Sequence, residues 1–181
     1  MLKEIENRRS IRKYQDKPVP QDVLNDILES ARLAPSGSNT QPWRFIVVRS
    51  KELREKICRA DHNQSWMLTA PVFLVCVADP RCQMDSGSDA EFSVNEESPE
   101  ISLKRVIRDT SIAVEHMALE AASQGLGTCW TGWYEQEEIR PVLNIPEDHY
   151  VCCVLTLGYP GEAPAPRPRK PMEELVRYET W

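Results

Sequence analysis

Helical spacing of apolar residues recurs along much of the chain. Between Val23 and Ala31, apolar residues return every three or four positions, which predicts an amphipathic helix that ends near Ala34. A longer helix is predicted from Glu100 to Gln124, charged in its first half and apolar nearly all round in its second. Such a helix lies either at the centre of a domain or in a subunit interface. Shorter helices are predicted at 2–9, after Ser50, near 135–143 and at 172–176.

Apolar runs of a different kind predict strands. Residues 43–48 form one such run, and 72–78 and 151–157 are continuously apolar, which is typical of strands covered on both faces. A further strand is predicted after a helix-ending glycine at Gly125. Together these runs predict a central sheet between helical layers.

One polar segment interrupts this pattern, from Arg81 to Glu100. It carries six acidic residues against a single basic one and few large apolar side chains. The acids are Asp85, Asp89, Glu91, Glu96, Glu97 and Glu100. We expect this segment to stay out of the core, as a lid, a mobile loop or a disordered insertion.

Length and composition predict one globular domain over residues 1–181. A net charge of −6 argues against nucleic acid as a partner, because phosphate backbones require a basic face. The charged N-terminus lacks the apolar core of a signal peptide, and no apolar run reaches membrane-spanning length, so we expect a cytoplasmic protein without a membrane partner. Six cysteines without a Cys-x-x-Cys pair and three scattered histidines predict reduced thiols and no metal site.

The connection between the first amphipathic helix and the first strand is a candidate ligand loop. It consists mainly of small and amide residues and is bracketed by Pro35 and Pro42. Such a loop allows a flat ligand to approach the backbone closely, although an ordinary helix-to-strand turn has the same composition. Further along, Gly132 stands between Thr131 and Trp133, which suggests close approach of a ligand or of another backbone, although a plain capped turn followed by an edge strand fits as well.

Basic residues gather near both ends of the chain. Arg8, Ser10 and Arg12 share a face if this segment is extended, and the two arginines share one if it is helical. Paired guanidiniums suit a phosphate, although a solvated basic patch has the same composition. Near the C-terminus, alternating prolines impose an extended backbone, so that Arg167 and Arg169 point the same way. This tail is also typical of a linker or a proline-rich peptide ligand, but its terminal aromatic residues indicate that it docks somewhere.

Four motifs, in this order, resemble those of the nitroreductase-like FMN flavoproteins. They are Arg8-Arg9-Ser10-Ile11-Arg12, the stretch 34–43, Gly125-Leu126-Gly127-Thr128-Cys129-Trp130, and Gly158-Tyr159-Pro160 with the stretch 167–171. The resemblance spans almost the whole chain except 81–100. It implies an α+β fold with a central mixed, mostly antiparallel sheet flanked by helices. It also implies an intertwined homodimer with two FMN molecules at the interface, dimer core formed by the apolar half of the long helix, and C-terminal arms (160–181) that wrap the partner.

The resemblance also implies the cofactor contacts, which fall into three groups. The phosphate and ribityl chain would be held by Arg8, Arg9, Ser10 and Arg12, completed by Arg169 or Arg167. The loop against the flavin ring, reached from the other subunit, would be Pro35, Ser36, Ser38, Asn39 and Gln41. The second wall of the ring would be Trp130, Thr131 and Gly132. No residue is expected to act as nucleophile or general acid, because flavin carries the reaction.

The implied activity is oxidation of NADH or NADPH through FMN, with a nitroaromatic or a quinone as the small acceptor. Relatives with the same scaffold suggest reductive dehalogenation or flavin fragmentation as alternatives, and a non-enzymatic flavin-binding redox module is a third. The acidic segment 85–100 predicts neutral or cationic acceptors, and NADH in preference to the additional phosphate of NADPH.

Overall fold

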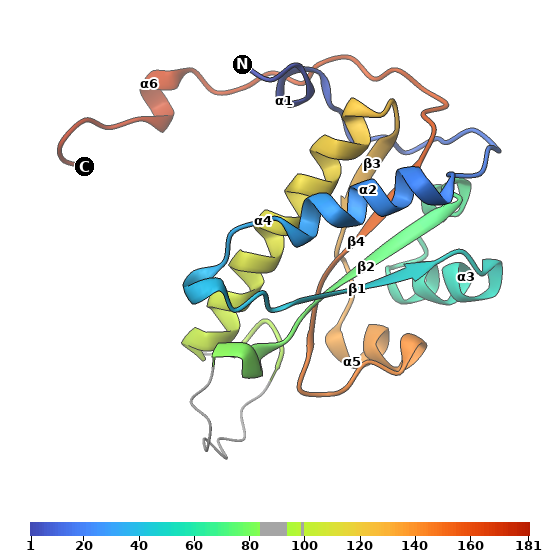
Figure 1. Cartoon of the computed structure of the whole chain (residues 1–181), viewed down its shortest axis with the longest axis horizontal. Helices are drawn as coiled ribbons and strands as arrows, with labels where there is room; N and C mark the ends of the chain where they lie inside the picture. The colour runs from blue at the N-terminus through green and yellow to red at the C-terminus, as the bar shows by residue number, and fades with distance from the viewer. Residues whose placement is uncertain (84–93, 99) are drawn as a thin grey trace.

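The computed structural model describes residues 1–83, 94–98 and 100–181, which form one sheet with helices on both faces (Figure 1). Its strands are β1 (Trp43–Val48), β2 (Val72–Ala78), β3 (Gly127–Thr131) and β4 (Tyr150–Gly158), in the order β1-β2-β4-β3. All three pairings are antiparallel, and a single isolated parallel bridge joins Ser10 to Thr128. The expected α+β architecture with a mostly antiparallel sheet is confirmed.

The two continuously apolar runs occupy the centre of the sheet, as predicted. Every residue of β2 is buried, and Val75 pairs with Val154 of β4. Burial on both faces follows from two separate apolar clusters: one lies between the sheet and helices α2 and α4, and the other lies towards α3 and α5. In the strand order β1-β2-β4-β3, strands β1 and β3 lie at opposite edges of the sheet.

The helices agree with the predicted spans to within a few residues. They are α1 (Lys3–Asn7), α2 (Gln21–Arg32), α3 (Lys51–Ala60), α4 (Ile101–Ser123), α5 (Gln136–Ile139) and α6 (Met172–Leu175). Single-turn 3₁₀ helices lie at Gly37–Asn39, Ser65–Thr69, Pro80–Gln83 and Arg140–Leu143. The helix predicted near 135–143 is thus divided into α5 and a 3₁₀ turn.

Helix α4 lies centrally and crosses α2 (Figure 1). Ala113, Val114, Met117 and Ala121 of its apolar half belong to the same buried cluster as Leu24 and Ile27 of α2. These α4 side chains therefore fill the core of this chain. Ile112 of the same half is exposed and lies outside this cluster, so the expectation that the apolar half also forms dimer core stays a prediction.

Glycines end α4 and bring the N-terminal segment against the sheet. Gly125 (φ +76°) caps α4, with Leu126 N donating to Ala121 O at 2.8 Å. Gly127 leaves room for Ile11: a Cβ on Gly127 would lie 2.4 Å from the Ile11 Cγ1. Ile11 N also donates to Thr128 O at 3.0 Å, so the arginine-bearing segment lies directly along the start of β3.

The segment between β2 and α4 departs from its prediction. Val94 is 7% exposed and packs with Ala78, Leu103 and Val106, and its carbonyl accepts from Arg140. The expectation that 81–100 stays out of the core is therefore wrong for this residue, because one apolar side chain is enough to anchor a polar segment. Acidic positions Asp85, Asp89 and Glu91 lie outside the described residues.

After β4 the chain runs along the N-terminal segment and then leaves the body of the molecule (Figure 1). Gly161 N donates to Lys13 O at 2.8 Å, and beyond this contact nearly every residue is exposed, including Tyr178 and Trp181. All six cysteines are free thiols. In the described part of the chain, no helix combines the length and the apolar character needed to cross a bilayer.

Candidate cofactor-binding site

Arginines from the two ends of the chain meet around one cavity of about 370 Å³, which we call the arginine cavity. Its lining residues are Arg8, Arg9, Ser10, Arg12, Glu162, Pro164, Ala165, Arg167 and Arg169. All six residues proposed for the phosphate and ribityl chain therefore lie together. The contacts of the N-terminal segment with β3, and of Gly161 with Lys13, bring these two distant stretches side by side.

Most of these guanidiniums have no acidic partner. Arg8 forms an ion pair with Glu115 of α4 (Nε to Oε1, 2.8 Å), while Arg9 donates to the carbonyl of Glu6 at 2.8 Å. Within the described ranges, no carboxylate pairs with the guanidinium of Arg9, Arg12, Arg167 or Arg169. Several like charges held near each other without counter-ions favour an anionic ligand.

Glu162 is a member of this cavity that sequence analysis missed. Its Oε1 accepts from the backbone N–H groups of Arg12 (2.6 Å) and Lys13 (3.2 Å). The carboxylate therefore ties the start of the proline-rich tail to the N-terminal arginine segment. No motif pointed to this residue, because its partners are backbone groups about 150 positions away in sequence.

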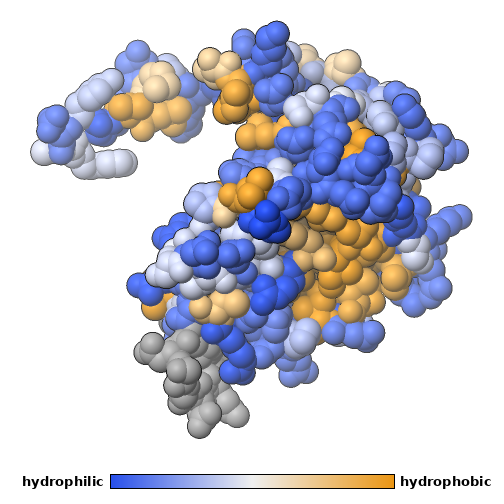
Figure 2. Space-filling view, viewed as in Figure 1, coloured by the Kyte–Doolittle hydropathy of each residue, from blue (hydrophilic) through white to orange (hydrophobic). Residues whose placement is uncertain are grey.

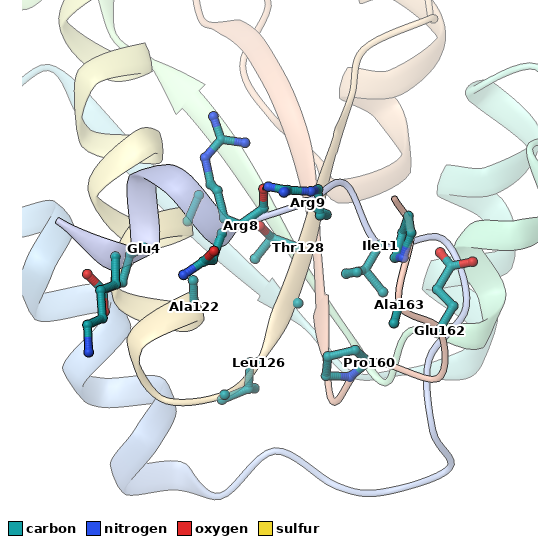
Figure 3. Close-up of a pocket in the computed structure, with 16 residues that line it drawn as sticks. Glu4, Arg8, Arg9, Ile11, Ala122, Leu126, Thr128, Pro160, Glu162 and Ala163 are labelled. Carbon is teal, nitrogen blue, oxygen red and sulfur yellow. The ribbon is translucent and has the colours of Figure 1, made fainter. Parts of the chain in front are cut away.

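A second cavity of about 420 Å³ adjoins the first and shares Arg8, Arg9, Glu162 and Pro164 with it. Figure 3 shows the two arginines beside Thr128 at the start of β3, with Glu162 and Ala163 on the far side of the opening. The rest of this second cavity is lined mainly by α1, by Ala122 near the end of α4 and by Leu126 in the turn that follows α4. The arginine cavity is therefore continuous with the second cavity on the side of α1.

The end of β3 is held by a buried carboxylate. Asp61 is fully buried and accepts from the Thr131 hydroxyl and from Trp133 N (2.8 Å). Gln64 Nε2 also donates to Thr131 Oγ1 at 2.7 Å. The Thr131 side chain is therefore engaged inside the protein, while Trp130 and Gly132 on either side of it are exposed.

Trp66 connects the β3 end to the arginine cavity. Its indole N–H donates to Gln64 Oε1 at 3.1 Å, and the Arg12 guanidinium lies 5.7 Å from the centroid of its ring. Neither Gln64 nor Trp66 was identified from the sequence. Gln64 precedes and Trp66 lies in the 3₁₀ turn Ser65–Thr69 after α3, a stretch whose composition carries no distinctive motif.

The Pro35–Gln41 loop has an unusual backbone. Ser38, Asn39 and Gln41 have φ values of 51°, 57° and 48°, in the left-handed region that side chains other than glycine and asparagine rarely adopt. Two anchors hold this conformation: Asp109 Oδ2 accepts from Gly37 N (2.9 Å), and Ser36 Oγ accepts from Gln41 N (3.0 Å). Strained backbone that is fixed in this way is common where a ligand binds.

Beside this loop lies a third cavity of about 340 Å³, which we call the loop cavity. It is lined by Gly37, Ser38, Thr40, Gln83, Arg105 and Arg108. The two arginines were not identified from the sequence, because the charged first half of α4 has the composition of an ordinary solvated helix face.

The three predicted groups do not all meet within one chain. The loop precedes β1 and Trp130–Gly132 ends β3, and two strands separate these edges, a distance of about 14 Å across the sheet. An aromatic ring is only about 3.5 Å thick, so these two walls cannot sandwich the same ring within a single chain.

The thiol nearest the arginine segment is not activated for chemistry. Burial raises the pKa of Cys129 above its ordinary value, and the opposing effect of Arg12 is smaller. Cys129 therefore stays protonated at neutral pH. In the part of the chain that the structure describes, no group of three or more His, Cys, Asp or Glu side chains could hold a metal ion.

Comparisons with known proteins agree on one family. Residues 5–159 match the Nitroreductase family. A Methanothermobacter thermautotrophicus protein, provisionally named NADH dehydrogenase/NAD(P)H nitroreductase, is 36% identical over 171 residues, covering 92% of this chain and 81% of that protein. A Bacillus subtilis (strain 168) protein named FMN reductase (NAD(P)H) is 31% identical over 186 residues, covering 100% and 74%. The structure of B. megaterium NfrA2 is 30% identical, with a TM-score of 0.87 over 99% of this chain and 74% of that one.

Proposed function

Since this chain belongs to the nitroreductase family, we propose that it is an FMN-dependent oxidoreductase that takes hydride from NADH or NADPH and passes it to a small acceptor, a nitroaromatic or a quinone. The observation that carries the proposal is the arginine cavity, in which cations from both ends of the chain gather next to β3. The names of the relatives point to the same cofactor and the same donors.

The chemistry of the arginine cavity fits the phosphate of FMN. A phosphate with a charge near −2 needs at least two cations when it is partly buried, and Arg9, Arg12 and Arg169 have no acidic partners within the described ranges. Ser10 adds a hydroxyl at the same opening. Glu162 does not oppose binding strongly, because its carboxylate is directed to two backbone N–H groups.

FMN supplies hydride transfer through its N5 atom when bound. The protein then has three tasks: the arginines anchor the phosphate, Trp130–Gly132 line one face of the ring, and the Pro35–Gln41 loop lines the other. The protein only has to hold the donor and then the acceptor over one open face of the ring, so no side chain is needed as a nucleophile. We assign no side chain as a general acid.

We propose that each flavin site is shared between two copies of the chain. The separation of the loop from β3 supports this, because a second protomer can supply the missing wall. The exposed tail supports it too: α6 carries exposed Met172 and Leu175, and Figure 2 shows an apolar hollow below α2. We infer that arms formed by residues 160–181 dock on the partner and that the homodimer is cytoplasmic.

Spectroscopy and donor oxidation test this function. The protein reconstituted with FMN should show a flavin spectrum and oxidise NADH or NADPH through many turnovers with a nitroaromatic or a quinone. Arg12→Ala should weaken FMN binding by about tenfold or more, because it removes a charge-assisted contact. Lys56→Ala on α3, an exposed residue that pairs with Glu52 at 2.6 Å, is the matched control.

The result that overturns the proposal is a failure of the FMN-loaded protein to oxidise either nicotinamide with any acceptor. A single reduction without further turnover would instead identify a non-enzymatic redox module. Halotyrosine substrates and a test for loss of reduced flavin in air separate the dehalogenation and fragmentation alternatives from the proposed reaction.

A further inference from the structure

Two arginines near the start of α4 face the strained loop. Arg105 and Arg108 are exposed, lie one turn apart and line the loop cavity together with Gly37 and Ser38. This cavity is separate from the arginine cavity, with which it shares no residue. Arg105 and Arg108 therefore do not belong to the group that we assign to the FMN phosphate.

Neither arginine is held in a close, fully formed ion pair by the described acids. Asp109 is the only acid within hydrogen-bonding distance of the residues that line the loop cavity in the described part of the chain, and it is already well used. Its Oδ2 accepts from Gly37 N (2.9 Å) and from Gln83 Nε2 (3.2 Å), while Arg108 Nε contacts its Oδ1 at 3.4 Å. Arg105 forms no ion pair with any described carboxylate, and its guanidinium interacts only electrostatically with Glu100 at the start of α4.

Two described acids of the preceding segment, Glu96 and Glu100, form their hydrogen bonds with partners outside the loop cavity. Glu96 accepts from the Tyr150 hydroxyl at 3.0 Å, and Glu100 accepts from Ser102 N at 2.9 Å, where it caps α4. The charges that line the loop cavity are cationic and attract phosphates. The predicted repulsion by the acidic segment stays a prediction, because Asp85, Asp89 and Glu91 lie outside the described residues.

We propose that Arg105 and Arg108 form an anion-binding subsite that takes a phosphate group of the dinucleotide electron donor. The inference rests on the proposed function, because the loop beside this cavity is the one assigned to the flavin ring. A donor whose nicotinamide lies on that ring carries its phosphates outwards, and two adjacent guanidiniums suit a phosphate in geometry and charge. The phosphate is either the 2′-phosphate of NADPH or the pyrophosphate that both donors contain.

Charge-removing variants test the subsite. Arg105→Gln and Arg108→Gln, singly and together, are compared with Lys104→Gln, which removes an exposed charge from the same turn of α4 outside the cavity. Calorimetry measures binding of 2′,5′-ADP and of ADP to the FMN-loaded protein. Steady-state kinetics measures KM for NADPH, for NADH and for a neutral dihydronicotinamide without phosphates.

We expect each arginine removed to weaken the phosphate-bearing ligand by about tenfold, with little effect of Lys104→Gln and no change in KM for the neutral donor. Losses confined to 2′,5′-ADP and NADPH identify the 2′-phosphate; equal losses for ADP and NADH identify the pyrophosphate. The proposal is overturned if neither nucleotide binds, if the double variant binds both as wild type does, or if KM for the neutral donor rises equally.

These outcomes are distinct from failure of the proposed function. If the wild-type protein oxidises no donor, including the neutral one, the oxidoreductase assignment fails, while calorimetry still decides whether the arginines bind a phosphate. If the neutral donor is oxidised and the variants bind both nucleotides as wild type does, the enzyme stands and the subsite fails.

Discussion

Several buried or half-buried polar residues of this protein hold the backbone in place through hydrogen bonds. Asp61 is the clearest case. Its fully buried carboxylate accepts hydrogen bonds from the Thr131 hydroxyl and from Trp133 N, and these bonds fix the end of β3. Thr131 was predicted from the sequence as part of the flavin wall, and its side chain is instead turned to this internal partner. Its role at the flavin stays a prediction, carried by backbone and by its exposed neighbours.

Asp61→Asn should lower the free energy of unfolding by about 2 kcal/mol, because it replaces one of two required acceptors with a donor in a buried position. FMN binding should weaken as well, since the end of β3 loses its anchor. Urea denaturation and fluorescence titration measure the two effects. Asp16→Asn, at an exposed position, is the control, and equal stability of the two variants would contradict this role.

Among the elements, the connection of β3 to the N-terminal segment matters most for the arginine cavity. Gly125 and Gly127 lie two residues apart but are required for different reasons, the first for backbone conformation and the second for packing space. Gly125 needs its positive φ, and a Cβ there would meet nothing within 4 Å; Gly127 has no such requirement, but its Cβ would press on Ile11. Sequence motifs identified the turn, but only the packing separates these roles.

These two glycines offer a paired prediction. Gly125→Ala should cost about 1 kcal/mol in stability through backbone strain alone and leave FMN affinity unchanged. Gly127→Ala should cost about 1–3 kcal/mol and also weaken FMN binding, because the segment that carries Arg12 must shift. Thermal unfolding and FMN titration distinguish them, and equal FMN affinity in both variants would show that this contact does not position the arginines.

At the scale of the whole molecule, the two predicted walls of the flavin site lie at opposite edges of one sheet. A shared site predicts complementation between inactive variants. Arg12→Ala and Asn39→Ala, each defective as a homodimer, should recover about a quarter of wild-type activity when mixed and refolded, because half of the dimers then carry one intact site of two. Sites contained within single chains would give no recovery, and activity measured before and after mixing decides between them.

The family resemblance and the α+β fold were predicted correctly because they depend on local signals. Apolar runs predicted strands at 43–48, 72–78 and 151–157, and each appears within a residue or two. The motif order that suggested the nitroreductase family agrees with the family match over residues 5–159. The resemblance implied that the apolar half of α4 forms dimer core; much of this half fills the core of the chain, and its place in a dimer stays a prediction.

What the sequence by itself determined was the set of elements and the two clusters of arginines, because periodicity and proline-imposed backbone are properties of neighbouring residues. Only the tertiary structure decided which groups meet. Glu162 reaches Arg12 N, Asp109 reaches Gly37 N, and Arg105 and Arg108 face the loop through contacts across 65 or more positions of chain. Those contacts follow from packing two helices and two sheet edges together, a three-dimensional arrangement that no local pattern encodes.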